Sequence, residues 1–211
     1  MIRILIADDH AIVREGLKQI LSEENDIIVT GEAGDAPELF NLLRKDTWDL
    51  IVLDINMPGK TGLEALKELR IQYPQIPVLI LSMYSEDQYG LRAIKAGASG
   101  YLKKVSAPDE LVKAIKKIVS GGKYISASLA ENLADNFGMD YKSAPHETLS
   151  DREYEILCKI AAGQSADSIA EEFSISVHTV YSYRNRILEK MNMKSNVELT
   201  RYAIKYKLME V

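Results

Sequence analysis

The first 120 residues alternate short apolar runs with segments whose apolar residues recur at helical spacing, and this alternation constrains the fold most. Strands that alternate with helices form a parallel sheet covered on both faces, with right-handed crossovers. We therefore expect an α/β fold with a doubly wound sheet. The expected strands are Ile2–Ala7, Ile27–Thr30, Leu50–Leu53, Val78–Leu81 and Tyr101–Leu102.

Helix signals lie between these runs. The stretch Ser85–Gln88 is typical of a capping box, and Asp35 and Ser106 precede first turns that contain proline. Five helices are therefore expected to cover the sheet. The clearest amphipathic segments are Val13–Leu21, Leu63–Leu69 and Leu111–Val119.

The pattern changes after Gly121-Gly122, because strand-like runs disappear. We predict three parts: an α/β domain over residues 1–122, a linker over 123–148 with a short helix around Ser128–Asn136, and a small all-α domain over 149–211. The last part has four expected helices with clear start and stop signals. They run from the capping box Ser150–Glu153 to about Ala162, and over Ala166–Phe173, Val177–Met191 and Val197–Tyr206.

Composition excludes several classes of protein. No apolar run approaches the roughly 18 residues of a membrane span, and no signal peptide is recognisable at the N-terminus. The single cysteine, Cys158, cannot form an internal disulfide and fits a helix core, and with three scattered histidines it makes a zinc site improbable. We expect a cytoplasmic protein that does not contact a membrane.

Polar side chains follow the expected strands. Asp8 and Asp9 follow the first and Asp54 the third, while Ser82 and Lys104 follow the fourth and fifth. In a doubly wound sheet these carboxyl ends are neighbours, so three carboxylates would share one pocket. Their mutual repulsion requires a cation, and Mg²⁺ suits hard oxygen ligands with room for phosphate oxygens. A carboxylate nucleophile, a hydroxyl and an ammonium group could together hold a phosphoryl group.

The chain resembles the two-component response regulators with a LuxR-type helix-turn-helix, the NarL/FixJ subfamily, over nearly its whole length. Two later stretches, "SYRNRILEKMN" and "NVELTRYAI", resemble the GacA/UvrY-like members that pair with BarA-type and GacS-type kinases. The remaining motifs are Asp8-Asp9-His10, Asp54 with Met57-Pro58-Gly59 and Gly62, Ser82, Gly100-Tyr101-Leu102-Lys103-Lys104, Leu149–Glu153, Gly163, Ile169-Ala170, Ile175-Ser176 and Thr179-Val180.

The resemblance implies a flavodoxin-like (βα)5 receiver domain and assigns roles within it. Asp54 would be the phosphoacceptor, with Asp8, Asp9 and Asp54 binding Mg²⁺. Lys104 rather than Lys103 has the family spacing from the aromatic residue and would pair with the phosphoryl group, while Ser82 and Tyr101 would form the switch. Ser82 departs from the threonine that many members carry, which keeps the hydroxyl but loses the methyl group.

The expected helix Val177–Met191 would be the recognition helix of the helix-turn-helix. Seven basic and three acidic residues lie in Val177–Val211, a local excess of positive charge although the chain carries −5 overall. We expect double-stranded DNA as a partner, a sensor histidine kinase as the phosphodonor, and a homodimer on activation. The candidate DNA contacts are Thr179, Tyr181, Ser182, Tyr183, Asn185, Arg186 and Lys190.

Two other classes compete with a phosphorylation-switched transcription regulator. A phosphohydrolase of the haloacid-dehalogenase type also uses an aspartate after a strand, but it needs a second aspartate two residues later, where this chain has Asn56. A DNA-binding protein that works without phosphorylation is the other. Uptake of phosphate from acetyl phosphate in the presence of magnesium would separate all three, and we expect the protein not to be an enzyme.

Overall fold

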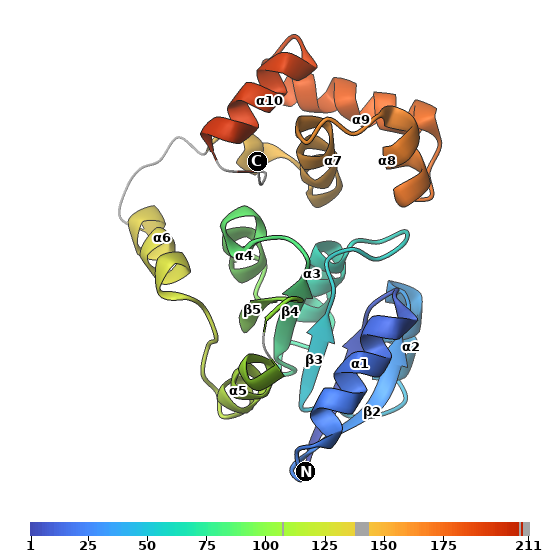
Figure 1. Ribbon diagram of the computed structural model, residues 1–211, viewed down its shortest axis with the longest axis vertical. Helices are drawn as coiled ribbons and strands as arrows, with labels where there is room; N and C mark the ends of the chain where they lie inside the picture. Colours follow the sequence, from blue (N-terminus) through green and yellow to red (C-terminus); the bar gives the residue numbers. More distant parts are fainter. Residues whose placement is uncertain (107, 138–143, 207, 209–211) are drawn as a thin grey trace. The chain divides into compact units, whose positions relative to one another are not determined.

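A computed structural model describes residues 1–106, 108–137, 144–206 and 208 (Figure 1). The chain divides into two compact units, Met1–Asn132 and Leu133–Val211. None of the described helices is long and apolar enough to cross a membrane.

The first unit is built on a five-stranded parallel sheet with the order β2-β1-β3-β4-β5 (Figure 1). This order confirms the doubly wound α/β fold. It also places the ends of β1 and β3 side by side, because these strands are neighbours. The strands are β1 (Ile2–Ala7), β2 (Ile27–Ala33), β3 (Leu50–Leu53), β4 (Val78–Ser82) and β5 (Gly100–Lys103).

Helices cover both faces of the sheet. Ile4 and Ile6 of β1 belong to one core cluster with Leu17 and Leu21 of α1 and with Leu111 of α5, so these two helices share a face. Successive residues of a strand point to opposite faces, and the intervening Leu5 is also fully buried. The helices of this unit are α1 (Ala11–Ser22), α2 (Ala36–Leu43), α3 (Gly62–Gln72), α4 (Glu86–Lys95) and α5 (Pro108–Val119).

Helix starts agree with the sequence in part. Asp35 caps α2 by accepting a hydrogen bond from the Glu38 amide at 2.8 Å. The expected capping box at Ser85 is wrong: Ser85 is the N-cap of α4, but its side chain makes no capping hydrogen bond. Thr61 and Glu64 form a capping box on α3 that sequence inspection missed. The start signal at Ser106 adjoins residue 107, which lies outside the described residues.

The chain after Gly122 continues to pack on the first unit. Tyr124 forms a parallel bridge with Gly100 of β5, and the Tyr101 amide donates to the Tyr124 carbonyl at 3.1 Å. Helix α6 (Ala127–Phe137) then begins, and its Leu129 is buried near Gly90 of α4. Contacts thus extend the first unit to Asn132, while the bounds of the three parts deduced from the sequence stay predictions.

The second unit is all-helical, as expected. Ser150 and Glu153 form the expected capping box on α7, and Gly163, with a φ of 81°, follows its end. Helix α7 packs on α9 and α10, and α8 packs on α9. Cys158 is buried in α7, as predicted. The elements are a 3-10 turn η1 (Pro145–Thr148), then α7 (Asp151–Ala161), α8 (Ala166–Glu172), α9 (Val177–Lys190) and α10 (Asn196–Lys205).

Candidate functional site

Two buried carboxylates meet at the carboxyl ends of β1 and β3. The Asp54 amide donates to the Ala7 carbonyl at 2.8 Å, which continues the pairing of the two strands to their ends. Asp8 and Asp54 therefore follow neighbouring strands, and they are only 2% and 3% exposed. Burial of two like charges in one place is unfavourable without a compensating cation.

Lys104 supplies positive charge to both carboxylates. Its Nζ lies 2.6 Å from Oδ2 of Asp8 and 2.8 Å from Oδ2 of Asp54. The Lys104 amide donates to the Ser82 carbonyl at 2.8 Å, which holds the end of β5 against β4. The ammonium group of Lys104, whose side chain is only 9% exposed, is thus aimed at the pocket from a backbone that is fixed to the sheet.

Burial and charge act against each other on these groups. Burial raises the pKa of Asp54 to about 6, with Lys104 opposing the rise and Asp8 adding to it. Burial lowers the pKa of Lys104, but the two carboxylates outweigh it, so its pKa is above its ordinary value. Lys104 is therefore protonated at neutral pH, and Asp54 is mostly ionised there but takes up its proton at a higher pH than an ordinary aspartate.

A third carboxylate completes an oxygen-rich cluster. One ligand atom from each of Asp8, Asp9, His10 and Asp54 lies within 4.8 Å of the others. Three carboxylates grouped this closely supply the hard oxygen ligands that Mg²⁺ prefers, so their chemistry fits such an ion. Sequence inspection did not assign His10 to the cluster. Its Nδ1 lies 2.6 Å from Oδ1 of Asp9, and its amide donates to Oδ1 of Asp8 at 2.9 Å.

The loop after β3 passes close to Asp54. A Cβ atom on Gly62 would lie 1.9 Å from the Asp54 carbonyl oxygen, so no other residue fits there without a backbone shift. The Gly62 amide donates to the Ile55 carbonyl at 2.7 Å, and Gly59 has a φ of 73°. Both glycines of the motif thus shape the loop that follows the acidic pocket.

Ser82 and Tyr101 lie on the adjacent strands β4 and β5. The Ser82 side chain is fully buried, and its Oγ accepts from the Tyr84 amide at 3.2 Å. The Tyr101 hydroxyl donates to the Tyr84 carbonyl at 2.9 Å, and burial raises the pKa of that hydroxyl above its ordinary value. One loop residue therefore contacts both side chains.

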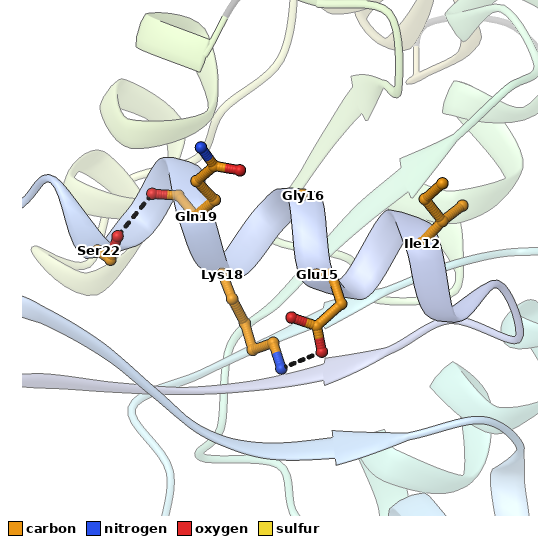
Figure 2. Close-up of a pocket in the computed structure, with 6 residues that line it drawn as sticks. All are labelled: Ile12, Glu15, Gly16, Lys18, Gln19 and Ser22. Atoms are coloured by element: carbon orange, nitrogen blue, oxygen red, sulfur yellow. Dashed lines mark hydrogen bonds and ion pairs between the residues drawn. The ribbon is translucent and has the colours of Figure 1, made fainter.

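A separate hollow runs along the outer side of α1 (Figure 2). It has a volume of about 500 Å³, and Ile12 at one end is 82% exposed. None of the predicted site residues lines it. The side chains drawn along it come from a single helix, and a Cβ on Gly16 would meet no atom within 4 Å. Its lining residues are Ile12, Glu15, Gly16, Lys18, Gln19 and Ser22.

Helix α9 of the second unit has one buried face and one accessible face. Val180, Ile187 and Met191 are buried as expected, with Leu188 half-buried. Ser176 caps the helix through the Thr179 amide at 3.0 Å. Among the predicted contacts, Tyr181, Asn185, Arg186 and Lys190 are exposed, whereas Thr179, Ser182 and Tyr183 are half-buried.

Several polar groups of α9 already have partners within their own unit. The Ser182 hydroxyl donates to the His178 carbonyl at 3.0 Å, and Arg184 donates to Asn196 at 2.7 Å. Lys190 lies 2.6 Å from Oε2 of Glu153, the residue that completes the α7 capping box. Lys190 therefore joins two helices, a relation between distant residues that periodicity in α9 could not reveal.

A doubly wound sheet with an acidic pocket and a lysine at its carboxyl edge, joined to a helical unit with a helix-turn-helix, defines a receiver-type signalling protein with a DNA-binding output. Residues 4–116 match the response regulator receiver domain family, and residues 147–203 match the bacterial regulatory proteins of the luxR family. The chain therefore belongs to the two-component response regulators with a LuxR-type helix-turn-helix, a family of transcription regulators rather than conventional enzymes.

Full-length relatives agree with this assignment. The chain is 35% identical to the response regulator UvrY of Escherichia coli strain K12, over 99% of this chain and 96% of the relative. It is 36% identical to the oxygen regulatory protein NreC of Staphylococcus epidermidis, over 99% of both chains. The predicted likeness to UvrY is confirmed, and NreC matches to the same degree. The RcsB response regulator of Salmonella typhimurium is 25% identical with a TM-score of 0.59, covering 97% of this chain and 98% of RcsB.

Proposed function

We propose that Asp54 is the phosphoacceptor of this response regulator and that its phosphorylation controls DNA binding by α9. The observation that carries the proposal is the position of Lys104 Nζ within 2.8 Å of both Asp8 and Asp54. A carboxylate oxygen of Asp54 would bond to phosphorus while the bond from phosphorus to its donor breaks. Lys104 would pair with the negative charge that arrives.

Asp8, Asp9 and Asp54 would hold Mg²⁺, as their oxygen chemistry and spacing suggest. The bound ion would supply positive charge to the phosphoryl oxygens. Before phosphorylation, Lys104 offsets part of the negative charge in this pocket. The phosphodonor would be a sensor histidine kinase, the partner of this family. This response regulator would act in the cytoplasm.

Ser82 and Tyr101 would carry the change away from Asp54. Both contact Tyr84, and the Tyr101 amide donates to the Tyr124 carbonyl beyond the end of α5. A shift of Tyr101 would therefore directly displace the segment that leads into α6. Two receiver states that differ in these contacts can shift the population of the output form.

The output would be a homodimer on double-stranded DNA, with α9 in the major groove. RcsB, at 25% identity, has been solved as two dimers bound to two parallel DNAs, which supports the same arrangement for this chain. Tyr181 and Asn185 would meet base edges, and Thr179, Ser182, Tyr183, Arg186 and Lys190 would add contacts around them. Asn185 can pair with adenine through two hydrogen bonds.

Magnesium-dependent uptake of one phosphoryl group from acetyl phosphate tests the first step. Intact-mass and peptide-mass measurements should place the group on Asp54, and Asp54→Ala should take up none while keeping its fold. The exposed Asp87→Ala is the matched control and should label as the wild type does. Stoichiometric labelling of Asp54→Ala would refute the assignment.

A further inference from the structure

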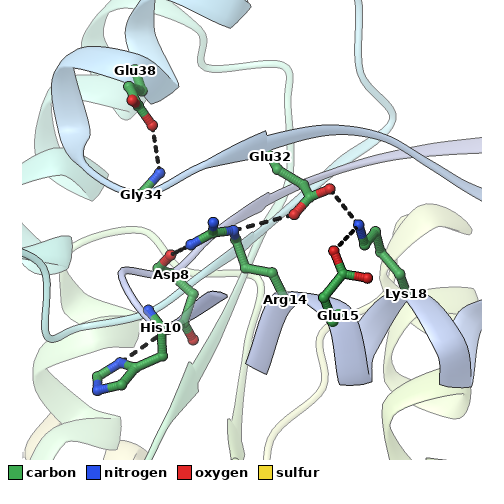
Figure 3. A network of polar contacts seen from close by, with 8 residues as sticks. All are labelled: Asp8, His10, Arg14, Glu15, Lys18, Glu32, Gly34 and Glu38. Atoms are coloured by element: carbon green, nitrogen blue, oxygen red, sulfur yellow. Dashed lines mark hydrogen bonds and ion pairs between the residues drawn. The ribbon is translucent and has the colours of Figure 1, made fainter. Parts of the chain in front are cut away.

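The backbone of Asp8 is held by an arginine that lies outside the acidic pocket (Figure 3). Nη1 of Arg14, on α1, donates to the Asp8 carbonyl oxygen at 2.7 Å. Nε of the same guanidinium donates to Oε2 of Glu32, on β2, at 3.2 Å. The Arg14 side chain is 19% exposed, so much of it is packed against its neighbours.

The Asp8 carbonyl lies where the pairing of the strands ends. The Asp8 amide still donates to the Ala33 carbonyl of β2 at 3.0 Å, and the Ala7 carbonyl accepts from Asp54. Beyond the last strand pairing, a backbone carbonyl needs another donor. Arg14 is that donor, so the peptide groups on both sides of Asp8 are fixed.

The guanidinium is itself fixed from the other side. Lys18 Nζ lies 2.7 Å from Oε1 of Glu32, and Lys18 also pairs with Glu15 at 2.5 Å (Figure 3). The hydrogen bond from Lys18, aided by Arg14, holds the pKa of Glu32 below its ordinary value despite some burial. Glu32 therefore stays ionised at neutral pH and anchors Arg14 to β2.

We propose that Arg14 is a positioning residue for the magnesium site, acting through the backbone of Asp8. The turn Asp8-Asp9 begins where the strand ends, and its carboxylates repel each other. Arg14 holds this turn in the conformation that presents both carboxylates to one ion before the ion arrives. The inference rests on the proposed magnesium site but concerns a residue outside it. Groups that orient metal ligands typically contribute 10–100-fold to metal affinity.

The arrangement calls for arginine rather than for positive charge alone. The planar guanidinium can donate to a carbonyl and a carboxylate at once in a fixed geometry, whereas a lysine ammonium is a point charge on a flexible stem. A simple surface ion pair with Glu32 would predict that lysine substitutes well at position 14. The two interpretations therefore differ in what they predict for Arg14→Lys.

Magnesium binding to the full chain, measured by calorimetry without a phosphodonor, tests the proposal. We expect Arg14→Ala and Arg14→Lys each to raise the dissociation constant by about tenfold. Arg14→Lys should keep its circular dichroism spectrum and its melting temperature in magnesium-free buffer. Arg44→Ala is the matched control, because Arg44 is an exposed arginine directly after α2, and it should bind magnesium as the wild type does.

Labelling by acetyl phosphate at a series of magnesium concentrations gives a second measurement. The half-saturating concentration should rise with the dissociation constant, while the rate at saturating magnesium stays within about twofold, because the ion then orders the turn itself. Wild-type magnesium affinity in Arg14→Lys would overturn the proposal, as would a lower saturating rate with unchanged half-saturation. If Arg14→Ala does not fold, Arg14→Lys decides. Failure of the wild type to bind magnesium would instead refute the proposed function.

Discussion

Nζ of Lys104 lies 2.8 Å from Oδ2 of Asp54, although β4 separates the two strands that these residues follow. The side chain of Lys104 therefore reaches across the end of β4, past Ser82, to the carboxylate. This relation places the ammonium group, the hydroxyl-bearing strand and the carboxylate along one edge of the sheet. A phosphoryl group on Asp54 would arrive where Lys104 and Ser82 can respond to it together.

The stability of the metal-free protein should depend on the ionisation of Asp54. The pKa of Asp54 in the folded protein is about 6, above the ordinary value of 3.8. Protonation of Asp54 therefore stabilises the folded state. This stabilisation is fully present below about pH 4 and is lost as the pH rises through 6. Asp54→Asn cannot ionise. The wild type should therefore lose stability between pH 4 and 7 while Asp54→Asn does not, so the free energy of unfolding of the variant relative to the wild type should rise by up to about 3 kcal/mol. Urea unfolding in EDTA measures this, with Asp87→Asn as control, and a pH-independent difference would count against it.

Asp9→Ala should weaken magnesium binding sharply. Asp9 contributes a carboxylate to the cluster, and in metal-free buffer its removal relieves repulsion with Asp8. The variant should therefore be no less stable than the wild type without magnesium but should gain less stability when magnesium is added. Calorimetry gives the affinity directly. Equal affinities in the two proteins would remove Asp9 from the site.

Gly90→Ala should reduce the coupling between phosphorylation and output. A Cβ on Gly90 would lie 3.0 Å from Leu129 and 2.7 Å from Glu86, and Glu86 accepts from the Ser126 amide at 3.2 Å. The substitution thus disturbs the packing of the first turn of α6 on α4 and leaves the acidic pocket unchanged. Phosphate uptake should be unchanged, while the ratio of DNA affinities with and without phosphodonor falls. An unchanged ratio would show that this contact does not carry the signal.

The accessible face of α9 should separate two kinds of DNA contact. Asn185→Ala should cost about 1–3 kcal/mol on the preferred site and little on scrambled DNA, because Asn185 is exposed on α9 and is the proposed contact to a base edge. Arg186→Ala should weaken binding to the preferred site and to scrambled DNA alike, and it should reduce the salt dependence of the binding constant by roughly one unit of log–log slope. Binding to both duplexes across a salt series measures this. An equal loss on both duplexes for Asn185→Ala would place the reading face elsewhere.

Lys190→Ala should also weaken binding to both duplexes. It removes the ion pair with Glu153 as well, so it should lower the stability of the protein. Because Lys190 is 42% exposed, that cost should be under about 1 kcal/mol. Thermal unfolding of Lys190→Ala beside Arg186→Ala distinguishes the two residues. A loss of stability in Arg186→Ala but not in Lys190→Ala would contradict the ion-pair argument.

The fold followed from the sequence because its signals are local and repeated: apolar runs, helical periods and capping residues. Apart from the local capping box of Thr61 and Glu64, the features missed from the sequence depend on pairs of distant residues. Strand β2 runs to Ala33 rather than Thr30, because its pairing with β1 continues through Gly31, Glu32 and Ala33 after a register shift between Ile4 and Leu5. The acidic pocket could be deduced because Asp8, Asp9 and Asp54 each follow an apolar run. Arg14 could not, because its role depends on a carbonyl and on a glutamate 18 residues away.

Measuring the DNA affinity of the full chain before and after phosphorylation tests whether Asp54 controls DNA binding. The wild type and Asp54→Asn would be incubated with magnesium and acetyl phosphate, the phosphorylated fraction measured by mass, and binding to a preferred duplex titrated alongside sedimentation. We expect tighter DNA binding and more dimer for the phosphorylated wild type, and no change for Asp54→Asn. Identical DNA affinity and oligomeric state in the phosphorylated and unphosphorylated wild type would contradict this expectation.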